Sequence, residues 1–334
     1  MKIYVIIPTH NSEKTILSTL NSYMEVKAKS SVEMDLLIVD DNSTDDTLKI
    51  IHNMGMSSNL FTNVSTGVSE ARNTALRYLF SKNEKDTWVT FLDSDDYLYS
   101  DFFGDISGEA KDFDYLVFEY QNYSMNESNF IDNNNAENKQ SNITKINSEL
   151  ALNKLISNFG GSKYNFNSPW GRIIKLDFLK KNDILFERQL SYKEDFLFNL
   201  EILQKLPIMG VSNQVGYLHI INPDSVVNNY ISNALVNEQF IQERLKHFNL
   251  TDKQIKFSQY NGWLGLQYVY VFPKNHVEDS VELRKKRFIE VFNYKKSFKL
   301  KDFYGKFYTK EFLFFILYKV KSFELLDRIF SFRG

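Results

Sequence analysis

Short apolar runs alternate with stretches of helical periodicity over the first 120 residues of this chain. Four runs have the length and apolar content of buried strands, namely residues 3–7, 36–39, 88–92 and 115–118. Between them, apolar positions recur every three or four residues, the spacing of an amphipathic helix. Alternating strands and helices are typical of a parallel sheet with helices on both faces. We therefore expect an α/β fold with a mostly parallel central sheet.

Polar residues at the strand ends predict where the first three helices begin. Asn11 or Ser12 can cap a helix after the first strand, Ser43 can cap one after the second, and Gly67 precedes a third. In such sheets, ligands bind outside the carboxyl ends of the strands. Acidic and polar residues gather at those ends in this chain, so a site is expected there.

Beyond the fourth run the pattern changes twice. Residues 121–147 are rich in Asn and Ser with few large apolar residues, and they predict a loop. From about residue 230 the periodicity is helical. We expect a first domain over residues 1–228, with halves at about 1–100 and 101–228, and a C-terminal helical region over residues 229–334.

The composition indicates a folded protein without disulfides. Of the 334 residues 43% are hydrophobic, enough for large cores, and there is no cysteine. Met1 and Lys2 lead directly into the first apolar run, which is shorter than the core of a secretory signal. A cytoplasmic location is therefore expected.

The C-terminal region is basic although the whole chain is nearly neutral. Residues 281–334 carry 14 Lys or Arg and 6 Asp or Glu, against a net charge of −2 for the chain. Near-neutrality argues against nucleic-acid binding, whereas a basic, aromatic tail suits the anionic inner face of a cell membrane. Residues 284–287 and 303–315 would make that peripheral contact, since no apolar run reaches the roughly 18 residues of a span. A packed helical subdomain or a homodimer interface is an equal alternative.

The four residues after the third apolar run form an acidic turn, Asp93, Ser94, Asp95 and Asp96. Mn²⁺ and Mg²⁺ take oxygen ligands, and one or two carboxylates together with substrate phosphates often suffice to hold Mg²⁺. An Asp-rich turn explains the same residues without any ligand. The motifs described next favour a metal site on Asp93 and Asp95.

Polar loops also follow the first and second apolar runs. Pro8, Thr9 and Asn11 stand at the end of the first run, and Asp40 and Asp41 at the end of the second. A carboxylate at such a strand end can accept hydrogen bonds from a nucleobase N–H or a ribose hydroxyl. Capping of the next helix is the alternative, and it leaves Asp40 and Asp41 unexplained.

Arg72 lies in the segment Gly-Val-Ser-Glu-Ala-Arg-Asn that opens the third predicted helix. Its guanidinium can contact a nucleotide or brace the acidic loops, and the sequence leaves both open. Glycine motifs for a pyrophosphate are missing, because residues 1–100 contain only Gly55 and Gly67. This argues against a nicotinamide dehydrogenase and a P-loop NTPase. A metal ion, and not a glycine loop, must then neutralise the phosphates.

Glu194 and Asp195 stand where a polar segment gives way to an amphipathic helix pattern. An acidic residue at a helix start can simply stabilise the helix. It can also be a general base, which must reach the proton of an acceptor hydroxyl. Beside the acidic turn upstream, the general base is the preferred interpretation of Asp195.

Five segments stand in a fixed order: PTHN, IVDDNSTDDT, GVSEARN, FLDSDD and SPWGRIIKLDFL with LSYKEDFLF. Their order and spacing resemble family 2 glycosyltransferases, and the resemblance covers about residues 1–225. It implies the GT-A fold, with a nucleotide-binding half and an acceptor half in the first domain. It further implies a nucleotide-sugar donor, a divalent metal, and one in-line displacement that inverts the anomeric carbon.

The resemblance also implies roles for single residues. Asp95, with Asp93, would hold the metal, and Asp195 would deprotonate the acceptor. Thr9 and Asp41 would hold the base, and Asp93 the ribose. The residues placed around the nucleotide sugar are Pro8, Thr9, Asn11, Asp41, Arg72, Asp93 and Ser94.

Three further residues belong to the acceptor or pyrophosphate side, namely Trp170, Glu194 and His219. Trp170 looks like the aromatic that borders the acceptor sugar in the family, and a core position explains it equally well. Many members carry a basic residue shortly before a Ser after the base helix, whereas His219 precedes Ser225 here. His219 would replace that contact to the pyrophosphate or metal, unless it is simply a histidine in a strand.

The expected function is transfer of a sugar from a nucleotide-diphosphate sugar, with UDP the commonest nucleotide, to a hydroxyl of a glycan or lipid-linked acceptor. The setting would be cell-surface polysaccharide assembly, with Mn²⁺ or Mg²⁺ as cofactor. A non-catalytic sugar-nucleotide or glycan-binding module is one alternative, but it needs neither Asp95 nor Asp195. A metal-dependent sugar nucleotidyltransferase is another, but its glycine-rich basic loop is missing.

Overall fold

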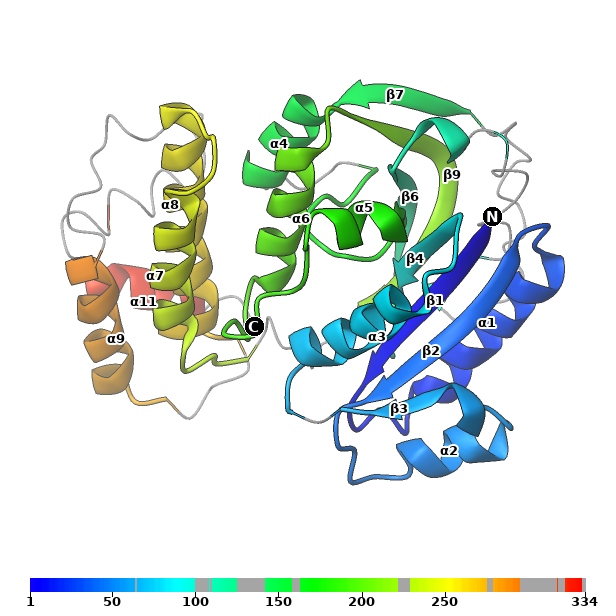
Figure 1. Cartoon of the computed structure of the whole chain (residues 1–334). Coiled ribbons are helices and arrows are strands. Elements are labelled where there is room, and N and C mark those ends of the chain that lie inside the picture. The colour runs from blue at the N-terminus through cyan, green and yellow to red at the C-terminus, as the bar shows by residue number, and fades with distance from the viewer. Residues whose placement is uncertain are drawn as a thin grey trace. The chain divides into compact units, whose positions relative to one another are not determined.

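The computed structural model describes residues 1–63, 65–99, 108, 110–124, 142–157, 163–221, 229–274, 279–294, 317 and 322–331. The chain divides into two compact units, residues 1–155 with 159–221 and residues 156–158 with 222–334. The first unit contains the sheet, and the described part of the second is helical (Figure 1). The first unit ends at residue 221, close to the domain boundary expected at residue 228.

The described strands of the first unit are β1 (Lys2–Thr9), β2 (Glu33–Asp40), β3 (Leu60–Thr62), β4 (Thr87–Phe91), β5 (Tyr97–Leu98), β6 (Tyr115–Ser124), β7 (Ile143–Asn147), β8 (Arg172–Lys175) and β9 (Ile208–Ile221). They form one sheet in the order β3-β2-β1-β4-β8-β6-β9-β5, with β7 beside β9. Strands β3, β2, β1 and β4 are parallel. Strand β8 pairs antiparallel with both β4 and β6. The sheet is therefore mixed, and the parallel arrangement expected for it holds in its N-terminal half.

Strands β1, β2, β4 and β6 confirm the four predicted apolar runs. The loop predicted over residues 121–147 is wrong at both ends, because β6 continues to Ser124 and β7 occupies Ile143–Asn147. Strand β7 pairs with β9 only, so it lies at an edge where polar side chains remain in water. A strand with exposed polar residues does not form an apolar run, so the sequence pattern does not predict β7. Residues 125–141 lie outside the described residues.

The described helices of the first unit are α1 (Ile16–Lys29), α2 (Thr47–Asn53), α3 (Val68–Lys82), α4 (Ser148–Ser157, apart from its last two residues), α5 (Leu176–Lys181) and α6 (Glu194–Lys205). Helix α3 begins after Gly67, as predicted, at a backbone φ of 113° that suits glycine. The caps predicted at Asn11, Ser12 and Ser43 are wrong, because α1 follows Thr15 and α2 follows Asp46. Ser43 instead accepts a hydrogen bond from the amide of Asn11 at 2.9 Å and joins the two loops.

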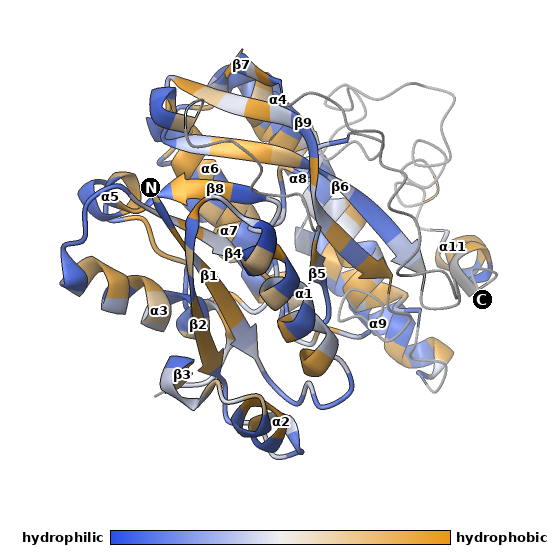
Figure 2. Ribbon diagram, turned by 90° about the vertical axis from the view of Figure 1, so that its right-hand side faces the viewer, coloured by the Kyte–Doolittle hydropathy of each residue, from blue (hydrophilic) through white to orange (hydrophobic). Residues whose placement is uncertain are grey.

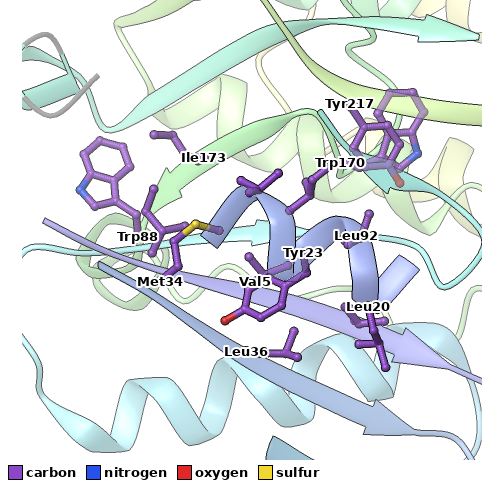
Figure 3. Close-up of a cluster of buried hydrophobic side chains, with 14 of the residues drawn as sticks. Val5, Leu20, Tyr23, Met34, Leu36, Trp88, Leu92, Trp170, Ile173 and Tyr217 are labelled. Carbon is purple, nitrogen blue, oxygen red and sulfur yellow. The ribbon is translucent and has the colours of Figure 1, made fainter. Parts of the chain in front are cut away.

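Helices cover both faces of the parallel strands, as expected. Figure 2 shows β1 and β2 between α1 and α3. On the α1 side, Val5 of β1 and Leu36 of β2 belong to one buried cluster with Leu20 and Tyr23 of α1 (Figure 3). Because these strands are packed on both faces, the positions of their carboxyl ends are fixed. The loops that follow them are fixed at the same edge of the sheet.

The described helices of the second unit are α7 (Ala234–Leu245), α8 (Asp252–Leu266), the π-helical turn η4 (Gln267–Val271), α9 (Val281–Tyr294) and α11 (Phe323–Ser331). The helical pattern predicted from residue 230 is thus confirmed in the described part of this region. No helix within the described ranges is long and apolar enough to cross a membrane.

The basic cluster predicted to face anionic lipid lies on α9. Arg284 pairs with Asp327 at 2.6 Å and Arg287 pairs with Asp279 at 2.5 Å. Arg287 is also buried, whereas Lys285 and Lys286 are exposed. Lys285 also pairs with Glu324 at 3.5 Å. Three of the four cations therefore form ion pairs inside the helical unit, which favours the packed-subdomain alternative. The aromatic stretch 303–315 lies outside the described residues.

Candidate active site

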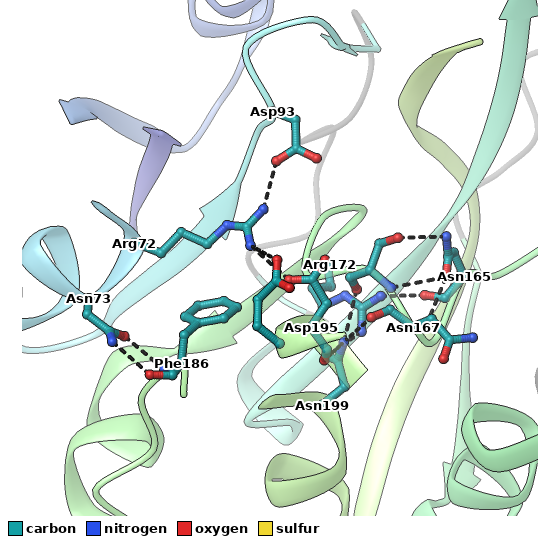
Figure 4. A network of polar contacts seen from close by, with 11 residues as sticks. Arg72, Asn73, Asp93, Asn165, Asn167, Arg172, Phe186, Asp195 and Asn199 are labelled. Carbon is teal, nitrogen blue, oxygen red and sulfur yellow. Dashed lines mark hydrogen bonds and ion pairs between the residues drawn. The ribbon is translucent and has the colours of Figure 1, made fainter. Parts of the chain in front are cut away.

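The buried side chain of Arg72 connects residues from three separate segments of the first unit. Its Nη2 donates to Oδ1 of Asp93 at 3.0 Å, and its Nη1 donates to Oδ1 of Asp195 at 2.8 Å and to Oε1 of Glu194 at 3.4 Å (Figure 4). Its guanidinium also lies 5.1 Å from the ring centroid of Phe186. Arg72 therefore braces the acidic groups, which is one of the two roles that the sequence left open.

The environment of Asp195 suits proton transfer. Burial has the largest effect and raises the pKa of Asp195 well above the ordinary value of an aspartate. The charge of Arg72 opposes this rise, while the charges of Glu194 and Asp93 add to it. A carboxylate whose pKa is raised toward neutrality is a better general base than an ordinary surface aspartate.

The acidic turn contains one carboxylate that other described residues leave unused. Asp95 is half-buried, and its carboxylate forms no hydrogen bond or ion pair with another residue within the described ranges. Burial, and then the charge of Asp93, raise the pKa of Asp95 to about 6. An unpaired carboxylate next to Asp93 fits a hard cation that also binds phosphates. No group of three or more potential ligands is present in the described part of the chain, so metal binding by Asp93 and Asp95 stays a prediction.

Asp96 has a structural position that sequence reasoning missed. Its buried carboxyl accepts hydrogen bonds from the hydroxyl of Tyr217 and the amide of Ile220, each at 2.7 Å. Burial is the main cause that raises the pKa of Asp96 to about 8, and the charge of Asp93 adds to it. The Tyr217 hydroxyl also accepts from the amide of Asp93 at 3.2 Å. Asp96 and Tyr217 therefore fasten the acidic turn to β9, a pairing for which the sequence carries no local signal.

Trp170 lies in the core, one of the two positions considered for it. It is 5% exposed and stacks on Tyr217, with ring centroids 4.3 Å apart and planes 3° apart (Figure 3). The ring of His219 lies on Trp170 at 5.5 Å, and its Nδ1 is 3.0 Å from Oδ1 of Asn122. Burial lowers the pKa of His219, so the imidazole is neutral near pH 7. Its contact to a metal or pyrophosphate stays a prediction.

Asp41 and Asn11 are engaged by the protein itself. The carboxylate of Asp41 accepts from Nδ2 of Asn63 and from the amide of Gly67, each at 2.8 Å, so it holds the start of α3. The backbone φ of Asn11 is 48°, and its Oδ1 accepts from the amide of Thr44 at 2.8 Å. Both residues shape the loops of the expected nucleotide site, and their direct contact with a base stays a prediction.

Three other residues of the expected nucleotide site lie close to these loops. Pro8 pairs in register with Val39 of β2. The hydroxyl of Thr9 is buried and has no hydrogen-bond partner in the described structure. The Oγ of Ser94 lies 2.7 Å from that of Ser12. Of these three residues, Thr9 is the best candidate for a ligand contact, because its buried hydroxyl lacks a hydrogen-bond partner among the described residues and a ligand could supply one.

The family of this chain follows from comparison with known proteins. Residues 4–181 match the family model "Glycosyl transferase family 2". This is more than half of the chain, so the chain belongs to that family. The predicted resemblance is confirmed.

The curated relatives are bacterial glycosyltransferases. The poly(ribitol-phosphate) beta-N-acetylglucosaminyltransferase TarS of Staphylococcus aureus is 26% identical over 250 residues, or 74% of this chain and 39% of TarS. The poly(ribitol-phosphate) beta-glucosyltransferase of Bacillus spizizenii is 23% identical over 67% of this chain and 33% of that enzyme. The chain therefore spans about two fifths and one third of the lengths of these relatives.

Among solved structures, residues 1–349 of S. aureus TarS in complex with UDP-GlcNAc match with a TM-score of 0.64 and 21% identity. The match covers 98% of this chain and 91% of that one. At this identity the likeness shows the fold alone. It confirms the GT-A fold that the sequence predicted.

Replacing Arg72 with Gln should destabilise the first unit, because Asp93, Glu194 and Asp195 would then face one another without a cation. Loss of one partner of a buried ion pair costs roughly 3–5 kcal/mol. We expect a loss of about 3 kcal/mol in the free energy of unfolding, since Asp93 and Asp195 keep some contact with water. Urea unfolding of both proteins at neutral pH measures this difference in the free energy of unfolding.

Arg77→Gln is the matched control, because Arg77 lies on the same helix, is 43% exposed and pairs with Glu70. Glu70 is buried but keeps a second cation, Arg188 at 2.9 Å, so the loss of the exposed Arg77 should cost only about 1 kcal/mol. Equal losses in the two variants would show that the ion pairs of Arg72 stabilise the fold no more than the single pair of Arg77 does.

Replacing Asp96 with Asn should change how stability depends on pH. With its pKa raised to about 8, folded Asp96 keeps a proton that the unfolded chain releases near pH 4. Its stabilising contribution is therefore full below about pH 4 and is lost as the pH rises to about 8. We expect the Tm of the wild type, relative to Asp96→Asn, to fall between about pH 5 and 8 in EDTA and to level off above.

Asp114→Asn, whose side chain is 46% exposed, is the control for this series. Its Tm should run parallel to that of the wild type across the range. Parallel curves for Asp96→Asn as well would refute the raised pKa of Asp96.

Proposed function

We propose that this chain transfers a sugar from a UDP-sugar to a hydroxyl of a cell-surface polymer, with inversion at the anomeric carbon. The single observation that carries the proposal is the Arg72 bridge between Asp93 and Asp195. It joins the acidic turn expected to face the donor with the carboxylate expected to face the acceptor. Membership of family 2 supports the same reading.

The relatives narrow the substrates of this proposal. TarS has been crystallised with UDP-GlcNAc, and the names of TarS and of the Bacillus spizizenii enzyme give poly(ribitol-phosphate) as the acceptor. The Escherichia coli relative WfaP is named a UDP-Glc β-1,3-glucosyltransferase. We therefore take UDP-GlcNAc and UDP-glucose as the first donors to test, and a polyol-phosphate polymer as the first acceptor. The β products in these names agree with an inverting reaction on an α-linked donor.

In the proposed reaction, Asp195 accepts the proton of the acceptor hydroxyl while the oxygen attacks the anomeric carbon and the bond to UDP breaks. Arg72 holds one oxygen of Asp195, which leaves the other oxygen for the acceptor. Asp95 and Asp93 would hold Mn²⁺ or Mg²⁺, which would neutralise the charge that develops on the leaving diphosphate. Glu194 accepts from the same Nη1 of Arg72 at 3.4 Å and helps to fix the guanidinium in place.

Two alternatives predict different products. A sugar nucleotidyltransferase would exchange pyrophosphate and release no UDP. A non-catalytic binding module would bind the donor and release nothing. Neither alternative requires the carboxylate of Asp195 beside the acidic turn.

A panel of nucleotide sugars with Mn²⁺ or Mg²⁺ tests the proposal. We expect UDP release from one UDP-sugar, greatly increased by poly(ribitol phosphate) and abolished by EDTA. Thermal shift with each donor measures binding independently of turnover. Binding without UDP release under every metal and acceptor would contradict the enzymatic proposal.

The expected membrane attachment and homodimer through residues 281–334 also remain proposals. The ion pairs of Arg284 and Arg287 within the helical unit support the packed-subdomain form.

Asp195→Asn should lower kcat by about 10²- to 10⁴-fold, the usual contribution of a general base. The amide oxygen can still accept from Arg72, so the donor KM should stay within about twofold. Steady-state kinetics of UDP release with acceptor measure both.

Asp177→Asn, an exposed position on α5, is the control and should keep full kcat. A kcat near the wild-type value in Asp195→Asn would remove Asp195 from the reaction.

A further inference from the structure

Arg172, at the start of β8, is a fully buried cation surrounded by neutral acceptors. Its Nε donates to the carbonyl of Trp170 at 3.0 Å and its Nη1 to Oδ1 of Asn199 at 2.9 Å. It also donates to the hydroxyl of Tyr115 and to the carbonyl of Asn165. In the described structure it forms no ion pair. A buried charge without a counter-ion is costly, so a purely structural role would be filled more cheaply by a neutral side chain.

Asn199 connects this cation to the helix that carries Asp195. It is fully buried in α6, and its Oδ1 accepts from Arg172. Its Nδ2 donates to the carbonyl of Asp195 at 3.0 Å, to that of Asn167 at 2.8 Å and to that of Ser168 at 3.1 Å (Figure 4). The first turn of α6 is thus held against the turn at residues 165–168 by a single amide.

We propose that Arg172 and Asn199 are positioning residues for Asp195, and that the unpaired charge of Arg172 stabilises the Asp195 carboxylate. The proposal rests on the proposed function only in taking Asp195 as the base. Arg172 contacts neither Asp195 nor the acidic turn, so it acts through Asn199 and through its charge.

The charges around Asp195 explain why a second cation is useful there. Asp195 faces Arg72 from α3, Asp93 from the turn after β4, and Glu194 from its own helix. These are three carboxylates and one guanidinium. The charge of Arg172 from β8 opposes the effect of burial on the pKa of Asp195. With Arg172, the three negative charges are opposed by two positive ones. Because Arg172 does not contact Asp195, it adds this charge without blocking an acceptor from the carboxylate.

Three variants separate position from charge. Arg172→Gln removes the charge, Arg172→Lys keeps it with fewer hydrogen bonds, and Asn199→Ala breaks the amide link but leaves Arg172 in place. Arg77→Gln removes a half-exposed cation from the same unit and is the matched control. Circular dichroism and thermal melting establish that each variant is folded.

The kinetic readout is UDP release from UDP-GlcNAc with poly(ribitol phosphate) and Mn²⁺. Displacement of a reacting group by about 1 Å can cost about 10²-fold. We expect Arg172→Gln and Asn199→Ala to lower kcat by about 10- to 100-fold with the donor KM within about twofold. Arg172→Lys should recover most of kcat, and Arg77→Gln should match the wild type.

The second readout needs no turnover. The ¹³C carboxyl resonance of Asp195, assigned by its absence in Asp195→Asn, reports the titration of that residue directly in metal-free protein. We expect a higher midpoint in Arg172→Gln than in the wild type, which would move the acid limb of kcat upward as well. Arg172→Lys and Asn199→Ala should keep a midpoint close to the wild type, because both retain the charge.

A wild-type kcat and midpoint in Arg172→Gln would overturn the proposal, as would equal losses in Arg77→Gln. If Arg172→Gln does not fold, the kinetic contrast between Arg172→Lys and Asn199→Ala decides the positioning role. A wild-type protein that releases no UDP would refute the proposed function. The resonance titration would still decide whether Arg172 acts on Asp195.

Discussion

The site depends on one buried guanidinium that holds three carboxylates. Arg72 forms ion pairs with Asp93, which follows a parallel strand, and with Glu194 and Asp195 in the first turn of α6. Without a cation between them, carboxylates at these distances would favour protonation of one member rather than three charges. Because Arg72 stands on α3, the position of that helix on the parallel strands decides where the acidic groups of both halves meet. The fold of the first unit can be understood as the frame that brings these segments to one guanidinium.

The parts of this frame that the sequence predicted are those with local signals. Apolar runs predicted β1, β2, β4 and β6, and Gly67 predicted the start of α3. The mixed half of the sheet escaped prediction, because β8 is short and β7 is an edge strand with exposed polar residues. Helix starts were misplaced where a polar residue bonds across to another loop, as Ser43 does with Asn11, instead of capping its own helix. A sequence pattern shows that a side chain is polar. It does not show which distant residue will be its hydrogen-bond partner in the fold.

The same limit applies to the expected binding residues. Asp41 and Asn11 were assigned to the nucleotide through a family resemblance, and the structure shows each of them bonded within the loops. Trp170 was placed equally at an acceptor or in a core, and it stacks on Tyr217 in the core. For Asp195 the sequence alone offers a helix-start carboxylate or a general base, since an acidic helix start is common. Its contact with Arg72 is what distinguishes it from an ordinary helix-start carboxylate.

The three aspartates of the acidic turn show how position separates the roles of identical side chains. Asp93 is bound to Arg72, and Asp96 is buried against Tyr217 and Ile220. Of the three, Asp95 alone has a carboxylate without a partner among the residues that the structure describes. A cation could therefore bind Asp95 without breaking an existing contact, whereas binding to Asp96 would require the loss of two hydrogen bonds in a buried place. A second ligand oxygen would come most easily from Asp93, whose Oδ1 already meets Arg72 and whose other oxygen is not taken by that contact. Asp93 and Asp95 would hold the cation, and Asp93 also binds the guanidinium that contacts Asp195. Arg72 is therefore the residue that the cation-binding side and the Asp195 side of the site have in common.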